Sequence, residues 1–227
     1  MWRKLINMWK SDNLLEQAWQ QSFEMLDITQ EMFLEAVRIL RESDDREMRQ
    51  EIKRRDKTVN AYEQEVRRKV MTHCALQGPN ELPGGLVLVS IVIDMERLGD
   101  YTKNIIDLVS YHPEKLDGGK FEEDLKRIEA AVKDNFVRTK ACIESSVEND
   151  ALSLLKEYEW VSRVSDDCLK DLIQEKDKNI SPGDSASLAL YFRWLKRINS
   201  HLRNITTSVV NPFDRIGFKP KSKNEDI

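Results

Sequence analysis

The sequence has few of the residues that break helices or cross-link chains. It contains 8 Gly, 6 Pro and 3 Cys in 227 residues, and only 7% of it is aromatic. Cys74, Cys142 and Cys168 are odd in number and form no Cys-x-x-Cys pair, which indicates buried or free thiols in a reducing compartment. We therefore expect a cytoplasmic protein.

Long apolar runs and one-signed charge blocks are also missing. The longest strongly apolar run, Leu86 to Ile93, is about eight residues long, whereas a membrane span needs about 20. We recognise no secretory signal. The net charge is -4 and there is no large basic block, which argues against nucleic acid as the main partner.

Catalytic signatures are equally scarce. None of His73, His112 and His201 has a Glu three residues before it, as the di-iron sites of helical bundles require. There is no phosphate-cradling Gly-rich loop and no Gly-x-Ser-x-Gly motif. The adjacent pair Ser200-His201 would point in different directions on a helix. The sequence therefore predicts a protein that is not an enzyme.

What is present is charge arranged with helical periodicity. Charged residues make up 33% of the chain, and rich charge with few breakers is typical of long amphipathic helices. The spacing predicts helices over residues 14–42, 45–75, 86–111, 121–149, 151–178 and 185–210. Short turns make neighbouring helices antiparallel, so we expect an all-α fold of two tandem three-helix bundles.

An internal repeat supports that division. At an offset of about 100 residues, 95–105 lies over 195–205, with the same Arg, Asn and Ile in both copies. The strongest linker signal is at 112–119. We place the first repeat at 1–113, the second at 119–211 and a tail at 212–227, extended or disordered beyond Phe218.

The most informative stretch is 91–105. Glu96, Asp100 and Asn104 are four residues apart, so a helix places their oxygens in a ladder beside an apolar stripe. Carboxylates at the buried edge of a helix need cations, hydrogen bonds or protons. Arg97 is one candidate partner, and a bound metal is another.

This stretch resembles the signature of the PhoU family. The sequence Glu96-Arg97-Leu98-Gly99-Asp100 followed by Asn104-Ile105 matches it, with Tyr101 and Thr102 where the family has His and Ala. Asp56-Lys57-x-x-Asn60 is similar to the family's second-helix signature. The resemblance implies a tandem repeat of three-helix units, multinuclear metal sites, and regulation of phosphate uptake and phosphate-responsive signalling. It also implies two kinds of partner, a phosphate transporter subunit and a sensor kinase.

We expect one metal site at most, in the first repeat. Its expected ligands are Asp56, Glu96 and Asp100, with Asn60 and Asn104 as weaker candidates. All-oxygen ligation suits Mg, Mn or ferric Fe, with Zn also able to bind through carboxylates. The alternative is a metal-free helical scaffold or adaptor, whose carboxylates pair with Arg97 and Lys103.

In the second copy, the positions that carry the chemistry have changed. Lys196 replaces the Glu of the motif and Ser200 replaces its Asp, whereas His201 and Asn204 remain at family positions. Asp166 is the candidate counterpart of Asp56. A site that has lost two carboxylates and gained an ammonium no longer attracts a cation, so we expect this second site to be empty. Lys196 is expected to pair with Asp166 or Asp167.

Residues 1–10 form a short amphipathic pattern. Trp2, Leu5, Ile6 and Trp9 share one helical face, with most basic residues off it. Such a segment can lie on an anionic membrane or pack on the protein's own bundle or on the second subunit of a homodimer. We expect the second arrangement, with Trp2 and Trp9 buried against protein and contact with a membrane peripheral at most.

Overall fold

The computed structural model describes residues 13–42, 46–112 and 114–220. Residues 1–10 and the last residues of the tail lie outside this range, so the expectations about them stay predictions. The described chain forms seven α-helices and three short 3-10 turns, and no strand: α2 (Leu14–Arg41), α3 (Arg46–Gln77), α4 (Leu82–Tyr111), α5 (Glu122–Ser145), α6 (Glu148–Glu157), α7 (Glu159–Ile173), α8 (Pro182–Val210), η1 (Pro79–Glu81), η2 (Gly119–Phe121) and η3 (Phe213–Arg215). The predicted all-α fold is confirmed.

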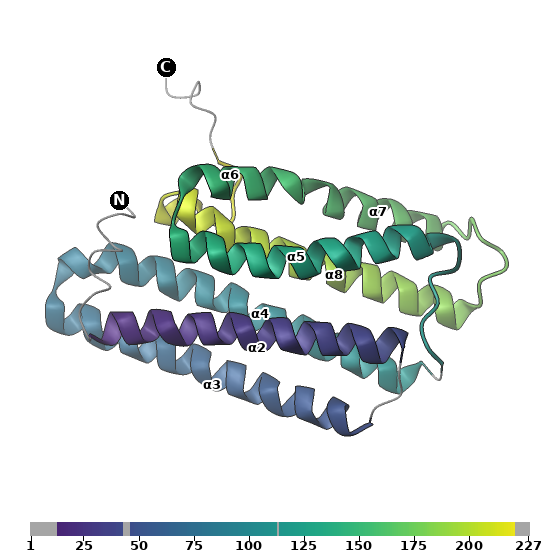
Figure 1. The fold of residues 1–227 in the computed structure, drawn as a ribbon, viewed down its shortest axis with the longest axis horizontal. Coiled ribbons are helices and arrows are strands. Elements are labelled where there is room, and N and C mark those ends of the chain that lie inside the picture. Colours follow the sequence, from purple (N-terminus) through teal and green to yellow (C-terminus); the bar gives the residue numbers. More distant parts are fainter. Residues whose placement is uncertain (1–12, 43–45, 113, 221–227) are drawn as a thin grey trace, which may run out of the picture.

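The helices form two layers of antiparallel neighbours (Figure 1). Helices α2, α3 and α4 pack together as one bundle, and α5, α6, α7 and α8 pack as a second. The two bundles join where α4 packs along α8 and α2 contacts α5. Buried side chains of both bundles belong to one continuous apolar core. None of the described helices has an apolar stretch long enough to cross a bilayer.

Helix starts follow local chemistry. The side chain of Asn13 accepts a hydrogen bond from the Glu16 N–H at 2.9 Å, and that of Ser181 accepts one from Asp184 N–H at 3.1 Å. Both are ordinary N-caps. Helix α4 begins at Leu82, four residues before the predicted start at 86. Pro83 is tolerated there because the first helical turn does not use its N–H groups.

The predicted fifth helix, 151–178, is wrong in detail. It is two helices, α6 and α7, which meet at Tyr158, and α7 ends at Ile173. Neither Pro nor Gly lies at the break, so nothing in the local sequence announces it. The buried Asn199 of α8 donates from Nδ2 to the Tyr158 carbonyl oxygen at 3.2 Å. The freed carbonyl is thus satisfied from the core.

Asn199 is part of a buried network in the second bundle. Asn135 of α5 donates from Nδ2 to Asn199 Oδ1 at 2.9 Å. Thr139 donates to Asn135 Oδ1 at 3.1 Å and its hydroxyl lies 3.3 Å from that of Thr206 on α8. These side chains therefore cross-link α5 and α8 in the interior.

The tail turns back along the second bundle as far as the structure describes it. Asn211 donates from Nδ2 to the carbonyl oxygens of Arg215 and Phe218 at 2.8 and 2.7 Å. Ile216 packs on the core, whereas Phe213 and Phe218 remain largely exposed.

Candidate functional site

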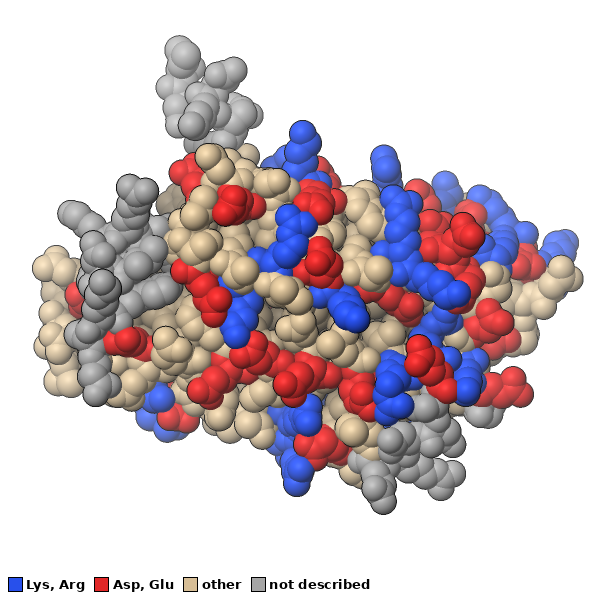
Figure 2. Space-filling model, in the orientation of Figure 1, with Lys and Arg blue, Asp and Glu red and all other residues tan. Residues whose placement is uncertain are grey.

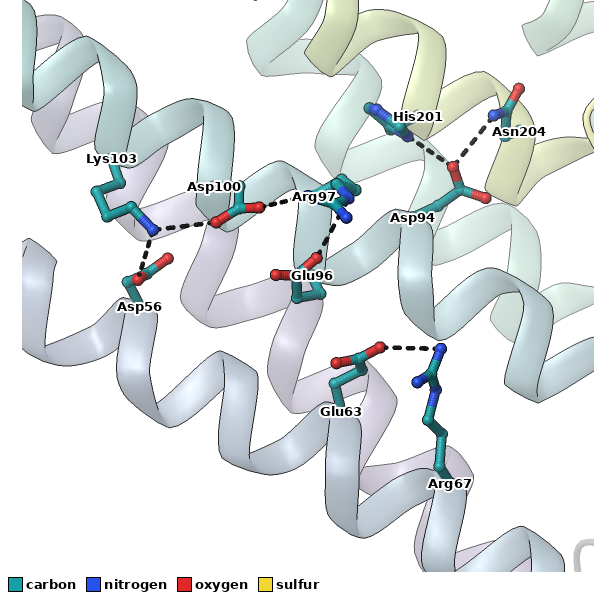
Figure 3. A network of polar contacts seen from close by, with 10 residues as sticks. All are labelled: Asp56, Glu63, Arg67, Asp94, Glu96, Arg97, Asp100, Lys103, His201 and Asn204. Carbon is teal, nitrogen blue, oxygen red and sulfur yellow. Dashed lines mark hydrogen bonds and ion pairs between the residues drawn. The ribbon is translucent and has the colours of Figure 1, made fainter.

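The predicted ligands lie along the contact between α3 and α4 (Figure 3). We call the set Asp56, Asn60, Glu96, Asp100 and Asn104 the acidic face. Met95, Leu98 and Thr102 are completely buried, and they hold the other side of α4 in the core. A Cβ atom on Gly99 would lie 3.6 Å from Asp56 Oδ1, so the Asp56 carboxylate packs close to the α4 backbone.

Lys103 bridges the two helices. Its Nζ lies 3.0 Å from Asp56 Oδ2 and 3.0 Å from Asp100 Oδ1. Burial lowers the pKa of Lys103, but the hydrogen bonds to the two carboxylates outweigh it and leave the pKa raised. Arg97 adds a contact to Asp100 at 2.7 Å. Lys103 and Arg97 thus pair with carboxylates of the acidic face, which is the arrangement that the metal-free alternative predicts.

Lys103 and Arg97 do not satisfy all the oxygens of the acidic face. Oδ1 of Asp56 and Oδ1 of Asn60 are buried and have no hydrogen-bond partner. The closest contact of the Glu96 carboxylate with Arg97 is 3.6 Å. Burial is the main cause that raises the pKa of Glu96, followed by the charge of Asp100. Unpaired buried oxygens beside a carboxylate that is costly to ionise are what a hard cation would satisfy.

The acidic face therefore fits a cation in its chemistry but not in the present side-chain positions. Among the described residues, no three His, Cys, Asp or Glu side chains are gathered closely enough to hold an ion. Lys103 is the obstacle, because its ammonium lies between Asp56 and Asp100. It is also partly exposed, with 31% of its side chain accessible. Asn104 is half-buried one turn beyond Asp100.

The residues of the predicted second site have other partners. Lys196 contacts Asp166 at 2.6 Å, which confirms their expected pairing. Ser200 donates to the Lys196 carbonyl oxygen at 2.9 Å. His201 and Asn204 instead hold Asp94 of α4: His201 Nδ1 lies 2.6 Å and Asn204 Nδ2 3.1 Å from Asp94 Oδ1.

Asp94 is a polar residue that the sequence analysis did not identify. It lies in the apolar first half of α4, and the residue 100 positions later is Trp194, so the repeat gives no hint of its role. Tyr101, which replaces the family's His, stacks on His201 with ring centroids 5.5 Å apart. These contacts join the two bundles and add no ligand to the acidic face.

This arrangement defines a class of protein: two tandem helical bundles with a carboxylate motif on the third helix of the first. Residues 23–109 match the family model of the PhoU domain. Over this stretch, which covers most of the first bundle, the chain is similar to the PhoU family. No curated protein sequence matches the chain.

Solved structures extend the similarity in fold to most of the chain. The phosphate transport system regulatory protein PhoU from Streptococcus pneumoniae is 19% identical, with a TM-score of 0.76, covering 86% of this chain and 93% of that one. PhoU from Pseudomonas aeruginosa is 20% identical, with a TM-score of 0.78, covering 87% and 95%. The second bundle thus has the PhoU fold as well, although its motif has changed.

Proposed function

We propose that this protein is a cytoplasmic PhoU-type regulator of phosphate transport and phosphate-responsive signalling. The observation that carries the proposal is the PhoU domain at residues 23–109 within a complete PhoU fold. One of the similar structures is a phosphate transport system regulatory protein by name. The role is regulatory rather than catalytic, as the family indicates.

Such a regulator acts by binding membrane-associated partners, a phosphate transporter subunit or a sensor kinase. On the face in Figure 2, Lys and Arg are interspersed with Asp and Glu, as suits protein partners better than nucleic acid. A pull-down from cells grown with and without phosphate tests this role. We expect a transporter or kinase subunit to be recovered in amounts that depend on phosphate. Recovery of neither under either condition would contradict the proposal.

The first repeat is proposed to hold metal through Asp56, Glu96 and Asp100, with Asn60 and Asn104 as weaker ligands. The unpaired oxygens of Asp56 and Asn60 support this assignment. Fe, Zn, Mg and Mn are the candidate ions. An ion bound to the acidic face would offer its remaining coordination positions to water or phosphate. The chain's own part is to hold the carboxylates and to move Lys103 aside.

The matched pair of variants for this site lies one repeat apart. Glu96→Ala with Asp100→Ala removes two of three carboxylates and should abolish tight metal binding, whereas Lys196→Ala with Ser200→Ala, at the corresponding positions of the second repeat, should leave it unchanged. Elemental analysis of protein purified without chelators measures the amount of bound metal per chain. Melting temperatures with added Mg, Mn, Fe or Zn measure the stabilisation that binding brings.

The alternative is a metal-free scaffold, and the position of Lys103 between Asp56 and Asp100 favours it. In that case the wild-type protein carries no metal, and none of the four ions raises its melting temperature. A regulator could still act without metal, so this outcome rejects the metal site and leaves the pull-down to decide the role.

A further inference from the structure

A second polar site lies on the other bundle, between α6, α8 and the described part of the tail. It is a cavity of about 630 Å³. Its charged lining residues are Lys156, Glu159, Arg203 and Lys219, and Leu155 and Phe218 give it an apolar wall. None of them belongs to the acidic face.

The charges in this cavity do not balance. Glu159 is the one acidic residue of the lining, and it pairs with Lys219 at 3.1 Å, so Lys156 and Arg203 have no carboxylate in direct contact. Lys156 is exposed, and its ammonium makes no hydrogen bond or close ion pair with any residue that the structure describes. The cavity therefore keeps two uncompensated positive charges in a protein whose net charge is -4.

Arg203 is the residue least satisfied by its surroundings. One of its terminal nitrogens donates to the Leu155 carbonyl oxygen at 3.2 Å. Its Nε is buried and has no hydrogen-bond partner. Burial lowers the pKa of Arg203, and the charge of Glu159 only partly offsets that. A bound anion would give this half-buried guanidinium the hydrogen-bond acceptor and the opposite charge that its protein surroundings do not supply.

The other polar groups of the cavity are already committed. Thr207 donates to the Asn204 carbonyl oxygen and accepts from Gly217 N–H at 2.7 Å. Gly217 has φ of 86°, a conformation that glycine adopts without strain, and this turn fixes the tail wall of the cavity. The unpaired donors of Arg203 and Lys156 therefore decide what binds.

The internal repeat explains why this place should attract an anion. At the offset of 100 residues, Arg203 corresponds to Lys103 and Ser200 to Asp100. In the first copy, the cation at this position lies between two carboxylates. In the second copy the cation has been kept, but the carboxylate next to it has become a hydroxyl. At corresponding positions the first bundle therefore has an excess of carboxylates, which suits a cation, and the second has an excess of cationic side chains, which suits an anion.

We propose that this cavity binds a small phosphate-bearing anion, with the phosphate on Arg203 and Lys156. A guanidinium presents paired N–H donors that match the oxygens of a phosphate group. The cavity also has room and apolar wall, at Leu155 and Phe218, for the organic part of a phosphate ester. This proposal does not depend on the regulatory role or on a bound metal, because anion binding can be measured on the purified protein alone.

The test is titration calorimetry of the full chain at constant ionic strength, with inorganic phosphate and AMP as probes. We expect binding of at least one probe. Stronger binding of inorganic phosphate assigns the site to the free ion, and stronger binding of AMP assigns it to a phosphate ester. Arg203→Gln should weaken binding at least tenfold. Lys156→Gln, at an exposed position that folding does not need, should weaken it severalfold.

The control is Arg193→Gln, which removes the same charge from an exposed position of α8 and should change the affinity less than twofold. Absence of binding of both probes to the wild-type protein would overturn the site. So would an equal loss in the control, which would indicate general electrostatic attraction, or unchanged binding in Lys156→Gln. A negative titration leaves the pull-down result standing, so the two proposals fail separately.

Discussion

Glu96 is the carboxylate of the acidic face whose charge is least compensated. Asp56 and Asp100 each contact Lys103 at 3.0 Å, whereas the closest contact of Glu96 with Arg97 is 3.6 Å. Its side chain is only 15% accessible. Burial and the neighbouring Asp100 raise its pKa, so the ionised form costs the folded protein stability.

Glu96→Gln should therefore raise the melting temperature of metal-free protein at pH 7. A carboxylate with a raised folded pKa binds more protons folded than unfolded, so its cost is absent below its ordinary pKa and fully present above the folded one. The gain should be roughly 2–4 °C if it amounts to about 1 kcal/mol, and should shrink as the pH falls through the folded pKa. Scanning calorimetry in the presence of a chelator, at several pH values, measures the two melting temperatures. Asp100→Asn is the control, and should lower the melting temperature because Arg97 loses its 2.7 Å ion pair and Lys103 loses one of its two carboxylates. A lower melting temperature for Glu96→Gln would contradict the argument.

At this scale the sequence predicts residues that share a helix better than residues that meet between helices. Glu96, Asp100 and Asn104 could be grouped because their spacing alone puts them on one face. Asp94 could not be connected with His201 and Asn204, because more than 100 residues separate them. Only the packing of α4 on α8 brings them together. That an ammonium occupies the space between Asp56 and Asp100 likewise depends on how α3 and α4 approach.

Two glycines of α4, Gly85 and Gly99, lie against residues of α3. A Cβ on Gly85 would lie 2.7 Å from Cys74 Sγ and 2.8 Å from Val70 Cγ1, closer than real contacts allow. At Gly99 the nearest atoms, on Asp56 and Val59, would be 3.6 Å away, an ordinary contact. A side chain is therefore excluded at Gly85 by neighbouring atoms but has room at Gly99.

Gly85→Ala should destabilise the protein by ~1–3 kcal/mol, because the added methyl group forces the helices apart. Gly99→Ala, the matched control in the same helix, should be neutral or stabilising by up to ~1 kcal/mol, because alanine favours helix more than glycine does. Urea unfolding of both variants measures the difference. Equal effects would mean that helix propensity alone decides both positions.

Helices are predictable here where their signals are local. The apolar periodicity places α2 and α8 to within a few residues, and in the structure Asn13 and Ser181 cap them. The start of α4 was placed late because Pro83-Gly84-Gly85 indicates a turn unless proline is given its helix-starting role. The break at Tyr158 could not be predicted, because its stabilising contact comes from Asn199, 41 residues away.

A half-buried ionic cluster joins the two bundles beyond their apolar contacts. Arg41 of α2 pairs with Glu122 and lies 3.3 Å from Glu129 Oε1, both on α5. The hydroxyl of Tyr191 donates to the same Glu129 oxygen at 2.7 Å. Burial raises the pKa of Glu129, although Tyr191 and Arg41 favour its charged form. Only 11% of the Arg41 side chain is accessible, so the cluster is mostly removed from water.

Arg41→Met should cost the whole molecule ~3 kcal/mol, because it leaves Glu129 buried without its cation. Arg54→Met is the control: its pair with Glu51 is exposed, with 77% of the Arg54 side chain accessible, and should contribute less than ~1 kcal/mol. Urea unfolding at pH 7 compares them. The cost of Arg41→Met should fall at acidic pH, once Glu129 takes up a proton. If Arg41→Met loses no more stability than Arg54→Met, the ionic cluster does not help to hold the two bundles together.

The two bundles also differ in what fixes the position of one helix along another. In the first, the buried hydroxyls of Ser22, Thr29 and Thr102 bond to carbonyls of their own helices, so those bonds survive if a helix slides. In the second, Asn135 and Asn199 bond across α5 and α8. Sliding by one turn, about 5.4 Å, would leave both amides buried and unpaired, at ~1–3 kcal/mol each. Register in the second bundle is therefore enforced by two fully buried amides, whereas the polar bonds between helices of the first bundle join Gln21 and Asp56 to partly exposed partners such as Lys69 and Lys103.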